Sequence, residues 1–170
     1  AGLAITPIES RDAYAEQVGF SSGFPVASDG TRAWLTHCYG MVGVGRGMEP
    51  NTGNGSSLYV VTGHAPRHLD RNITLVGRVL HGIENLTVLP RGTGPLGFYE
   101  NVEQQVPVKG IRLGSDADVK DPITLEVMRT DSAAFGAYVT GRTHRNEDWF
   151  VDPTGRIELC NLRPPVRQVD

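Results

Sequence analysis

The chain has 170 residues, of which 39% are hydrophobic, so it is long enough for one compact domain with an extension. Its 16 basic and 19 acidic residues give a formal charge of -3, which argues against a nucleic-acid binder that relies on neutralising phosphates. No run approaches eighteen consecutive apolar residues, so we expect a soluble protein without a membrane partner. The 21 glycines and 11 prolines lie mostly between short apolar runs and favour a β-rich domain with tight turns.

The first part of the chain, residues 1–30, is rich in Gly, Ser, Pro and Asp and shows only fragments of periodicity. We therefore predict an irregular lead-in. Because the chain starts with neither a methionine nor a charged leader, we expect that any earlier segment has been removed.

A core region follows at residues 31–115. Residues 34–44 alternate in part and contain β-branched and aromatic side chains, which predicts one strand bent at its glycines. Residues 58–62 predict a buried strand, and residues 74–80 predict a third strand. A last strand is expected at 106–113, on a sheet edge because it contains a proline.

One short helix is expected inside this core region. Apolar residues at Ile83, Leu86 and Leu89 fall on one face of a helix, and Pro90 ends it.

The composition changes at residue 116, so residues 116–170 are expected to form a C-terminal extension with a weak helix and a Pro-rich tail. Residues 116–122 read as a linker, and Thr130 or Asp131 can cap a helix with Phe135 on its apolar side. A short strand is expected at 157–160.

Cys38 and Cys160 are the two cysteines of the chain, and each lies in an apolar run. They leave two interpretations open, buried free thiols or one internal disulfide, which would imply an oxidising compartment. Two thiols alone provide no multi-thiol metal site.

Other kinds of site receive little support from the sequence. The glycine-rich run at 43–47 is followed by a turn and not by the helix N-terminus that would hold a phosphate. The histidines do not show zinc-ligand spacing on one regular element. Ser56, His68 and Asp70 are the residue types of a hydrolase triad, but no G-x-S-x-G elbow accompanies them.

The most informative segment is residues 40–82, where apolar blocks of strand length alternate with polar blocks of turn length. In order it contains GMVGVGR at 40–46, PNT at 50–52, NGS at 54–56, HLD at 68–70 and VGRV at 76–79. In this order and spacing the motifs resemble the second half of a cyclophilin-type peptidyl-prolyl isomerase, in a divergent bacterial form. The resemblance extends more loosely to residue 113.

The resemblance implies a mainly β protein with a cyclophilin-like antiparallel β-barrel, of which this chain supplies about half. Cyclophilins close their strands into a barrel with a helix over each open end. The family's first strands, first helix and Phe-His-Arg segment have no counterpart in this sequence. We therefore expect an upstream segment or a second chain to complete the barrel.

The resemblance also implies a groove that binds proline-containing polypeptides. Tyr59 and Leu69 match positions that line the proline pocket, and Gly45 and Arg46 match the strand that pairs with the peptide backbone. Tyr59 stands where the family has a phenylalanine, so its hydroxyl needs a partner if it is buried.

Further positions of the expected groove depart from the family or vary within it. Ser57 replaces a glutamine, His68 stands where a tryptophan or histidine is usual, and Ile73 replaces a histidine.

The implied activity is rotation about X-Pro bonds during protein folding, which requires no cofactor and no metal. Because the family's catalytic arginine belongs to the Phe-His-Arg segment, we expect it upstream of this chain and expect no catalytic residue within it. The alternative is a non-catalytic module that binds proline-containing peptides or acts as a scaffold. The disulfide interpretation favours a periplasmic or secreted location over the cytoplasm.

Overall fold

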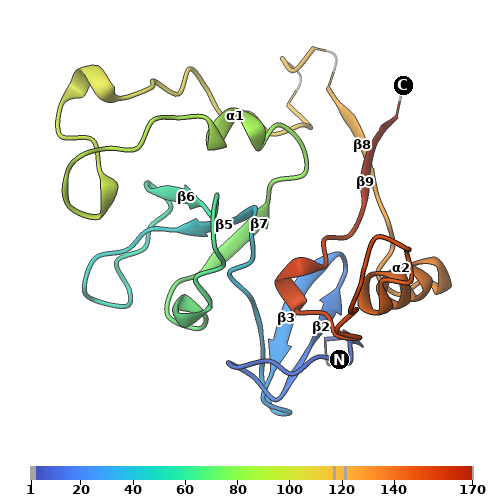
Figure 1. Ribbon diagram of the computed structural model, residues 1–170. Coiled ribbons are helices and arrows are strands. Elements are labelled where there is room, and N and C mark those ends of the chain that lie inside the picture. Colours follow the sequence, from blue (N-terminus) through green and yellow to red (C-terminus); the bar gives the residue numbers. More distant parts are fainter. Residues whose placement is uncertain (1–2, 117, 121, 170) are drawn as a thin grey trace.

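The computed structural model describes residues 3–116, 118–120 and 122–169, which form three antiparallel sheets (Figure 1). The first sheet contains β1 (Thr6–Pro7), β2 (Gln17–Ser21), β3 (Phe24–Ser28) and β4 (Ala33–Leu35). The second contains β5 (Met41–Val44), β6 (Leu58–Val60) and β7 (Leu75–Arg78), and the third contains β8 (Thr124–Val127) and β9 (Val166–Val169). The α-helices are α1 (Glu84–Thr87) and α2 (Ala133–His144), and the 3-10 helices are η1 (Arg67–Leu69), η2 (Pro95–Gly97), η3 (Val102–Gln104) and η4 (Leu159–Asn161).

The hairpin of β2 and β3 corrects the prediction of an irregular lead-in over residues 1–30. The two strands pair from Gln17 opposite Ser28 to Ser21 opposite Phe24. Ser22 and Gly23 form the two-residue turn, and both have positive φ, 48° and 83°. Two positive φ values give the turn the twist that a tight hairpin requires. In the sequence, this turn is marked by a Ser-Gly pair, which indicates a hairpin less strongly than the usual Asn-Gly pair.

The expected single strand at 34–44 is in fact two strands in different sheets. β4 pairs with β3 in the first sheet, whereas β5 is the central strand of the second, between β6 and β7. The connection turns at Gly40, whose φ of 84° is unfavourable for residues with a side chain. The buried residues of this connection, Thr36 to Cys38, therefore lie between the two sheets.

The predicted strands at 58–62 and 74–80 correspond to β6 and β7, with shorter bounds. β6 is less buried than expected, because it lies on the edge of its sheet and Leu58 is 50% exposed. The helix expected at 83–89 corresponds to α1, which buries no residue.

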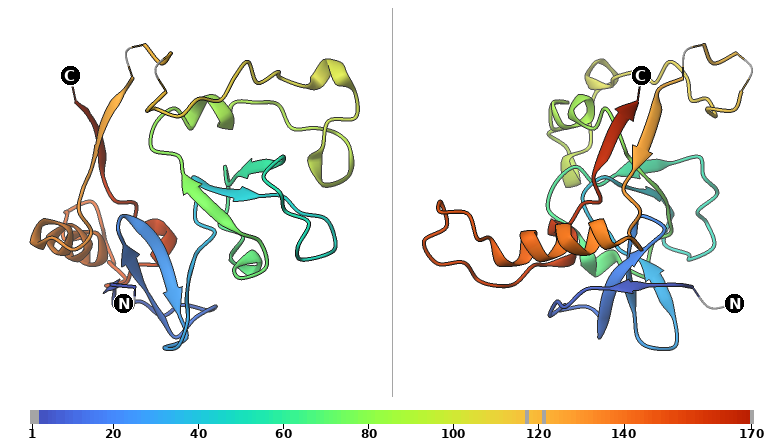
Figure 2. Two further views of the ribbon diagram at one scale, coloured as in Figure 1. Left: turned by 180° about the vertical axis from the view of Figure 1, so that it is seen from behind. Right: turned by 90° about the vertical axis from the view of Figure 1, so that its right-hand side faces the viewer.

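The strand expected at 106–113 does not form in the described chain. Residues 88–116 instead follow an open path beyond the β5–β7 sheet, away from the hairpin, and contain η2 and η3 (Figure 2). Val106, Val108 and Ile111 are 55%, 76% and 74% exposed, so the alternating pattern has no described sheet to pack on. Pro107 removes one backbone donor as well.

The C-terminal helix is present, but its cap differs from the prediction. Ser132 is the N-cap of α2 and accepts a hydrogen bond from the Phe135 N–H at 3.1 Å, a role expected for Thr130 or Asp131. Of the predicted linker at 116–122, residues 117 and 121 lie outside the described residues.

The strand expected at 157–160 is also replaced. The chain forms η4 there, and the regular pairing lies further on, where β9 runs antiparallel to β8. Pro164 and Pro165 precede β9, so the Pro-rich tail contributes a strand that the sequence analysis did not predict.

The C-terminal part shares its core with the first sheet. The rings of Phe20 on β2 and Phe135 on α2 meet edge to face with centroids 5.2 Å apart, and Leu159 and Leu162 are almost fully buried beside them.

The structure joins Cys38 and Cys160 in a disulfide, with Cα atoms 4.9 Å apart, rather than leaving two free thiols. The result is a mainly β protein with antiparallel sheets and few helices, as predicted, but the described residues do not close a barrel. In the described ranges, no helix is long and apolar enough to cross a membrane.

Candidate functional site

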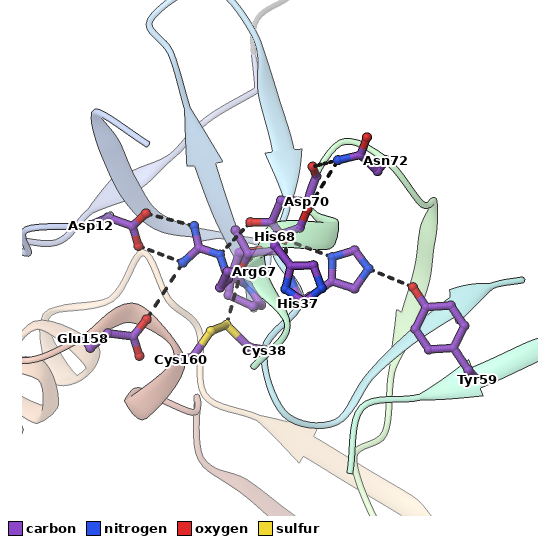
Figure 3. A network of polar contacts seen from close by, with 12 residues as sticks. Asp12, His37, Cys38, Tyr59, Arg67, His68, Asp70, Asn72, Glu158 and Cys160 are labelled. Atoms are coloured by element: carbon purple, nitrogen blue, oxygen red, sulfur yellow. Dashed lines mark hydrogen bonds and ion pairs between the residues drawn. A yellow bond between two sulfur atoms is a disulfide. The ribbon is translucent and has the colours of Figure 1, made fainter. Parts of the chain in front are cut away.

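A buried chain of polar contacts connects the N-terminal segment with β6 (Figure 3). Arg67 donates from its terminal nitrogens to both oxygens of Asp12, at 2.7 and 3.0 Å, and from Nε to Asp70. Asp70 Oδ1 lies 2.9 Å from His37 Nδ1 and also accepts the His37 backbone N–H at 2.8 Å. His37 Nε2 in turn lies 2.7 Å from the hydroxyl of Tyr59.

The charges in this chain of contacts compensate one another. Burial alone would raise the pKa of Asp70, but hydrogen bonds from His37 and Arg67 together hold it below its ordinary value. Burial alone would lower the pKa of Arg67, but Asp12 and Asp70 raise it above its ordinary value. Both groups are therefore ionised at neutral pH, and a buried charge of this kind is tolerated only with such partners.

Local structure places these residues where the two sheets meet. His37 and Cys38 lie in the turn between β4 and β5, whereas Arg67 and Asp70 belong to η1 and the residue that ends it. η1 forms because Ala65, Pro66 and Arg67 accept hydrogen bonds from residues two or three positions ahead, which folds the chain tightly enough to bring Arg67 and Asp70 together.

Tyr59 reaches His37 across the second sheet. It pairs with Gly43 on β5, and its ring lies directly over that residue, so that a Cβ at Gly43 would overlap the ring. Burial, followed by the negative charge of Asp70, raises the pKa of Tyr59 above its ordinary value. When a neutral His37 donates through Nδ1 to Asp70, its Nε2 accepts, so the neutral Tyr59 hydroxyl is the donor.

The loop after η1 is held against the end of β5. Arg46 Nε donates to the carbonyl of Asn72 at 3.0 Å, and Arg46 Nη1 donates to the carbonyls of Gly47 and Met48 at 2.8 and 3.1 Å. One arginine therefore ties two neighbouring loops together. Arg71, at the tip of the second loop with a φ of 68°, stacks over the ring of Trp34 at 5.0 Å.

Four of the seven expected groove residues lie at the end of β5 and the start of β6. Gly45 and Arg46 directly follow β5, and Ser57 directly precedes β6. The N–H of Gly45 donates to the carbonyl of Ser57 at 2.8 Å, so this donor is already used within the sheet and does not remain for a bound peptide. Tyr59 lies two residues further along β6.

The other three expected residues lie in or just after η1. Leu69 is partly buried, and its carbonyl accepts the N–H groups of Asn72 and Ile73 at 2.9 and 3.3 Å. His68 is exposed and does not join the buried chain of contacts. Ile73 is partly buried and leads into β7.

Sequence reasoning did not select the buried polar residues as site residues. The signal was a histidine at position 37 inside an apolar run, since a buried imidazole requires polar partners. In the sequence, its partner Asp70 is a candidate only for a hydrolase triad with Ser56 and His68. In the structure Asp70 bonds to His37, and Ser56 bonds to Asn54 at 2.7 Å, so no such triad is assembled.

We found no cluster of three metal-ligating side chains in the part of the chain that the structure describes. The site therefore consists of hydrogen-bonding groups and partly apolar surface. Such an arrangement can hold a peptide and orient a hydroxyl, which are tasks that need no covalent step.

Comparison with known proteins agrees with this architecture. Residues 6–113 match the family "Cyclophilin type peptidyl-prolyl cis-trans isomerase/CLD". Among solved structures, cyclophilin AquaCyp293 from Hirschia baltica is similar, with a TM-score of 0.61 and 23% sequence identity over 97% of this chain. The match spans 60% of that protein's chain.

No curated protein matched the sequence significantly. The family match covers more than half of the chain and includes the hairpin, both sheets around His37 and the loop of Asp70. The chain belongs to the cyclophilin-type peptidyl-prolyl cis-trans isomerase family.

Proposed function

We propose that this chain forms the peptide-binding half of a prolyl isomerase that acts on X-Pro bonds of polypeptides. The observation that carries the proposal is the state of Tyr59. Its hydroxyl is satisfied from within by His37, while the side chain stays partly exposed. A proline ring can therefore pack on the tyrosine without stranding a buried polar group.

The chemistry of the reaction explains what else is needed. Rotation about an X-Pro bond faces a barrier of about 18–20 kcal/mol, which falls when a donor weakens amide resonance at the proline nitrogen. Arg67 is bound to two carboxylates and Arg46 to three carbonyls. Both arginines of the candidate site are therefore engaged in holding the fold, and we propose that the catalytic arginine lies upstream of this chain.

The same reasoning extends the proposal to the missing part of the barrel. β6 is an edge strand of its sheet, and Leu58 on it and Val76 on β7 are 50% and 57% exposed. An upstream segment or a second chain would pair with and cover these strands. The clients of the assembled protein would be proline-containing polypeptides.

The disulfide supports a proposal for location. A bond between Cys38 and Cys160 persists in an oxidising compartment, so a periplasmic or secreted protein fits better than a cytoplasmic one. Measuring the free thiol content of the protein purified under non-reducing conditions tests this directly, because two reactive thiols after unfolding would contradict it.

A protease-coupled assay with a proline-containing peptide tests the activity. We expect no acceleration by this chain alone and acceleration by an assembly in which an upstream segment or a second chain completes the barrel. If that assembly also fails, the enzyme proposal is wrong.

If no catalysis is observed, titration with a proline-containing peptide followed by NMR tests the alternative, a module that binds without catalysis. The replacements at Ser57 and Ile73 favour this alternative. Shifts of the Tyr59 ring signals without turnover would support the alternative. Unchanged Tyr59 signals, in this chain and in the completed assembly, would remove both groove-based proposals.

A further inference from the structure

We propose that a second site, on the side of β7 that faces the C-terminal extension, binds a small organic anion bearing a phosphate group. The site is a hollow of about 410 Å3 between β7, the residues before α1, helix α2 and the segment that leads into β9. Its polar lining comes from Tyr39, Arg78, Tyr138, Arg142, Asn161 and Arg163. This inference goes beyond the proposed function and does not rest on it.

The first argument is charge. Three arginines line the hollow, and its lining residues include no aspartate or glutamate. Other arginines of the described chain, such as Arg112, Arg129 and Arg167, form ion pairs with carboxylates. Arg78, Arg142 and Arg163 form none among the described residues. Three arginines that line one hollow, none of them in an ion pair among the described residues, are suited to an anion of charge about -2, such as a phosphate monoester.

The second argument is the burial of Arg78. It is the last residue of β7, is only partly exposed, and makes no side-chain hydrogen bond within the described residues. Burial, with no opposing acidic group, lowers the pKa of its guanidinium. A partly buried cation without a partner is an unfavourable feature of the fold that a bound anion would relieve.

The third argument is that Arg142 and Arg163 each stack on a tyrosine ring. Arg142 lies over the ring of Tyr138 at 5.7 Å and Arg163 over the ring of Tyr39 at 5.2 Å, each measured to the ring centroid. The Tyr138 hydroxyl donates to the carbonyl of Arg163 at 3.1 Å and links the two pairs. Stacking restrains a guanidinium but leaves its N–H groups free, so both arginines are positioned before a ligand arrives.

Nearby carboxylates do not occupy these arginines. Glu147 lines an adjacent hollow with Arg142 but makes no ion pair with it in the described structure, and Glu126 on β8 is paired with Arg167. Among the described residues, neither carboxylate therefore forms an ion pair with an arginine of the hollow.

Size and lining indicate that the ligand is more than inorganic phosphate. The volume falls in the range of small-molecule sites, about 300–1,000 Å3. Ile83, Pro165 and Val166 also line the hollow, and their apolar side chains can pack on an organic portion of the ligand. A phosphate monoester with an apolar or aromatic group fits both parts.

Calorimetric titration at 150 mM chloride with phenyl phosphate, and with inorganic phosphate for comparison, tests the proposal. We expect saturable binding of both probes, tighter for phenyl phosphate, and at least tenfold weaker binding in Arg78→Gln. Arg163→Gln, an exposed rim variant that is expected to fold normally, should also weaken binding. Arg112→Gln, an exposed arginine outside the hollow, is the matched control and should leave the Kd unchanged.

Two results would overturn the inference. One is the absence of saturable binding of either probe by the natural sequence. The other is binding that is equally strong in Arg78→Gln and Arg163→Gln, or equally weakened in Arg112→Gln, since this would indicate only diffuse attraction to positive charge. Neither result depends on prolyl isomerase activity, which is measured separately.

Discussion

At the scale of single residues, His37 connects the charged and the aromatic parts of the candidate site. Its backbone and its ring both bond to Asp70, and its other ring nitrogen bonds to Tyr59. The ring itself is fully buried. Because each partner is also buried at least in part, removal of the imidazole affects groups on both sides.

We predict that His37→Ala destabilises the protein by about 3 kcal/mol, because it leaves a cavity and two polar partners without one of their bonds. Tyr59→Phe should cost only about 1 kcal/mol, since it removes one hydroxyl and keeps the ring over Gly43. Urea denaturation followed by circular dichroism measures both. An equal loss of unfolding free energy in the two variants would show that the imidazole does not stabilise both Asp70 and Tyr59.

The pH dependence of stability should follow Asp70. Its pKa is lowered in the folded protein, so the unfolded chain binds a proton more readily. Its contribution is complete above the ordinary aspartate value and is lost as the pH falls through the lower, folded value. We therefore expect the urea midpoint to fall steeply below about pH 4, near the reference value for aspartate.

Two variants test this assignment. Asp70→Asn should be less stable at pH 7 and show a flatter acid limb than the natural protein. Asp152→Asn is the control, because that carboxylate is exposed and forms no ion pair among the described residues, so its acid limb should match that of the natural protein. An acid limb that is identical in Asp70→Asn and the natural protein would assign the effect to other carboxylates.

At the scale of elements, the sequence predicted β6 and β7 from short apolar runs whose ends are marked by turn residues. It predicted α2 from a capping residue followed by apolar side chains on one side of a helix. The hairpin of β2 and β3 was missed because it is buried on both faces, which removes alternation, and because its turn is Ser22–Gly23. The strand at 106–113 was predicted from alternation alone, and alternation cannot reveal that no neighbouring strand is present.

The candidate site shows the same limit. Its groove positions came from short motifs, at 45–46, 57–59 and 68–73, each of which is local in sequence. The buried polar chain joins Asp12 to Arg67, which is 55 positions away in the sequence. A contact between such distant residues leaves no local sequence pattern. Only the fold brings Arg67 between its two carboxylates.

The glycines of the elements differ in what they tolerate, and this gives a paired prediction. Gly141 in α2 is exposed and a Cβ there meets no atom within 4 Å, so Gly141→Ala should stabilise the protein by about 0.5–1 kcal/mol. Gly43→Ala should destabilise it, because the new Cβ overlaps the Tyr59 ring. Thermal unfolding compares the two; a stabilising Gly43→Ala would contradict the packing of Tyr59 on β5.

At the scale of the whole molecule, apolar surface remains uncovered around the second sheet and the segment that follows it. Leu58, Val76 and Leu96 are 50%, 57% and 97% exposed. Exposed apolar side chains beside an edge strand promote association. The missing barrel strands would cover part of this surface.

We predict that the isolated chain self-associates at micromolar concentration. Sedimentation velocity measures this, and Leu58→Lys combined with Val76→Lys should shift the population toward monomer. Val151→Lys is the control, since Val151 is 99% exposed but lies outside this region. A monodisperse, thermally stable monomer of the natural chain would show that the uncovered sheet needs no partner.

The bond between Cys38 and Cys160 also determines how the molecule would respond to mechanical force. It spans 122 positions of the sequence, so a pull on the two ends is transmitted through the sulfur atoms and bypasses everything between them. At about 3.5 Å per residue, roughly 430 Å of contour length is shielded. Tyr59, Asp70 and the whole β5–β7 sheet lie inside that shielded loop, and Asp12 and the β2–β3 hairpin lie outside it. Tension applied to the two ends would therefore load the β2–β3 hairpin and β9 and leave the sheet with Tyr59 unloaded.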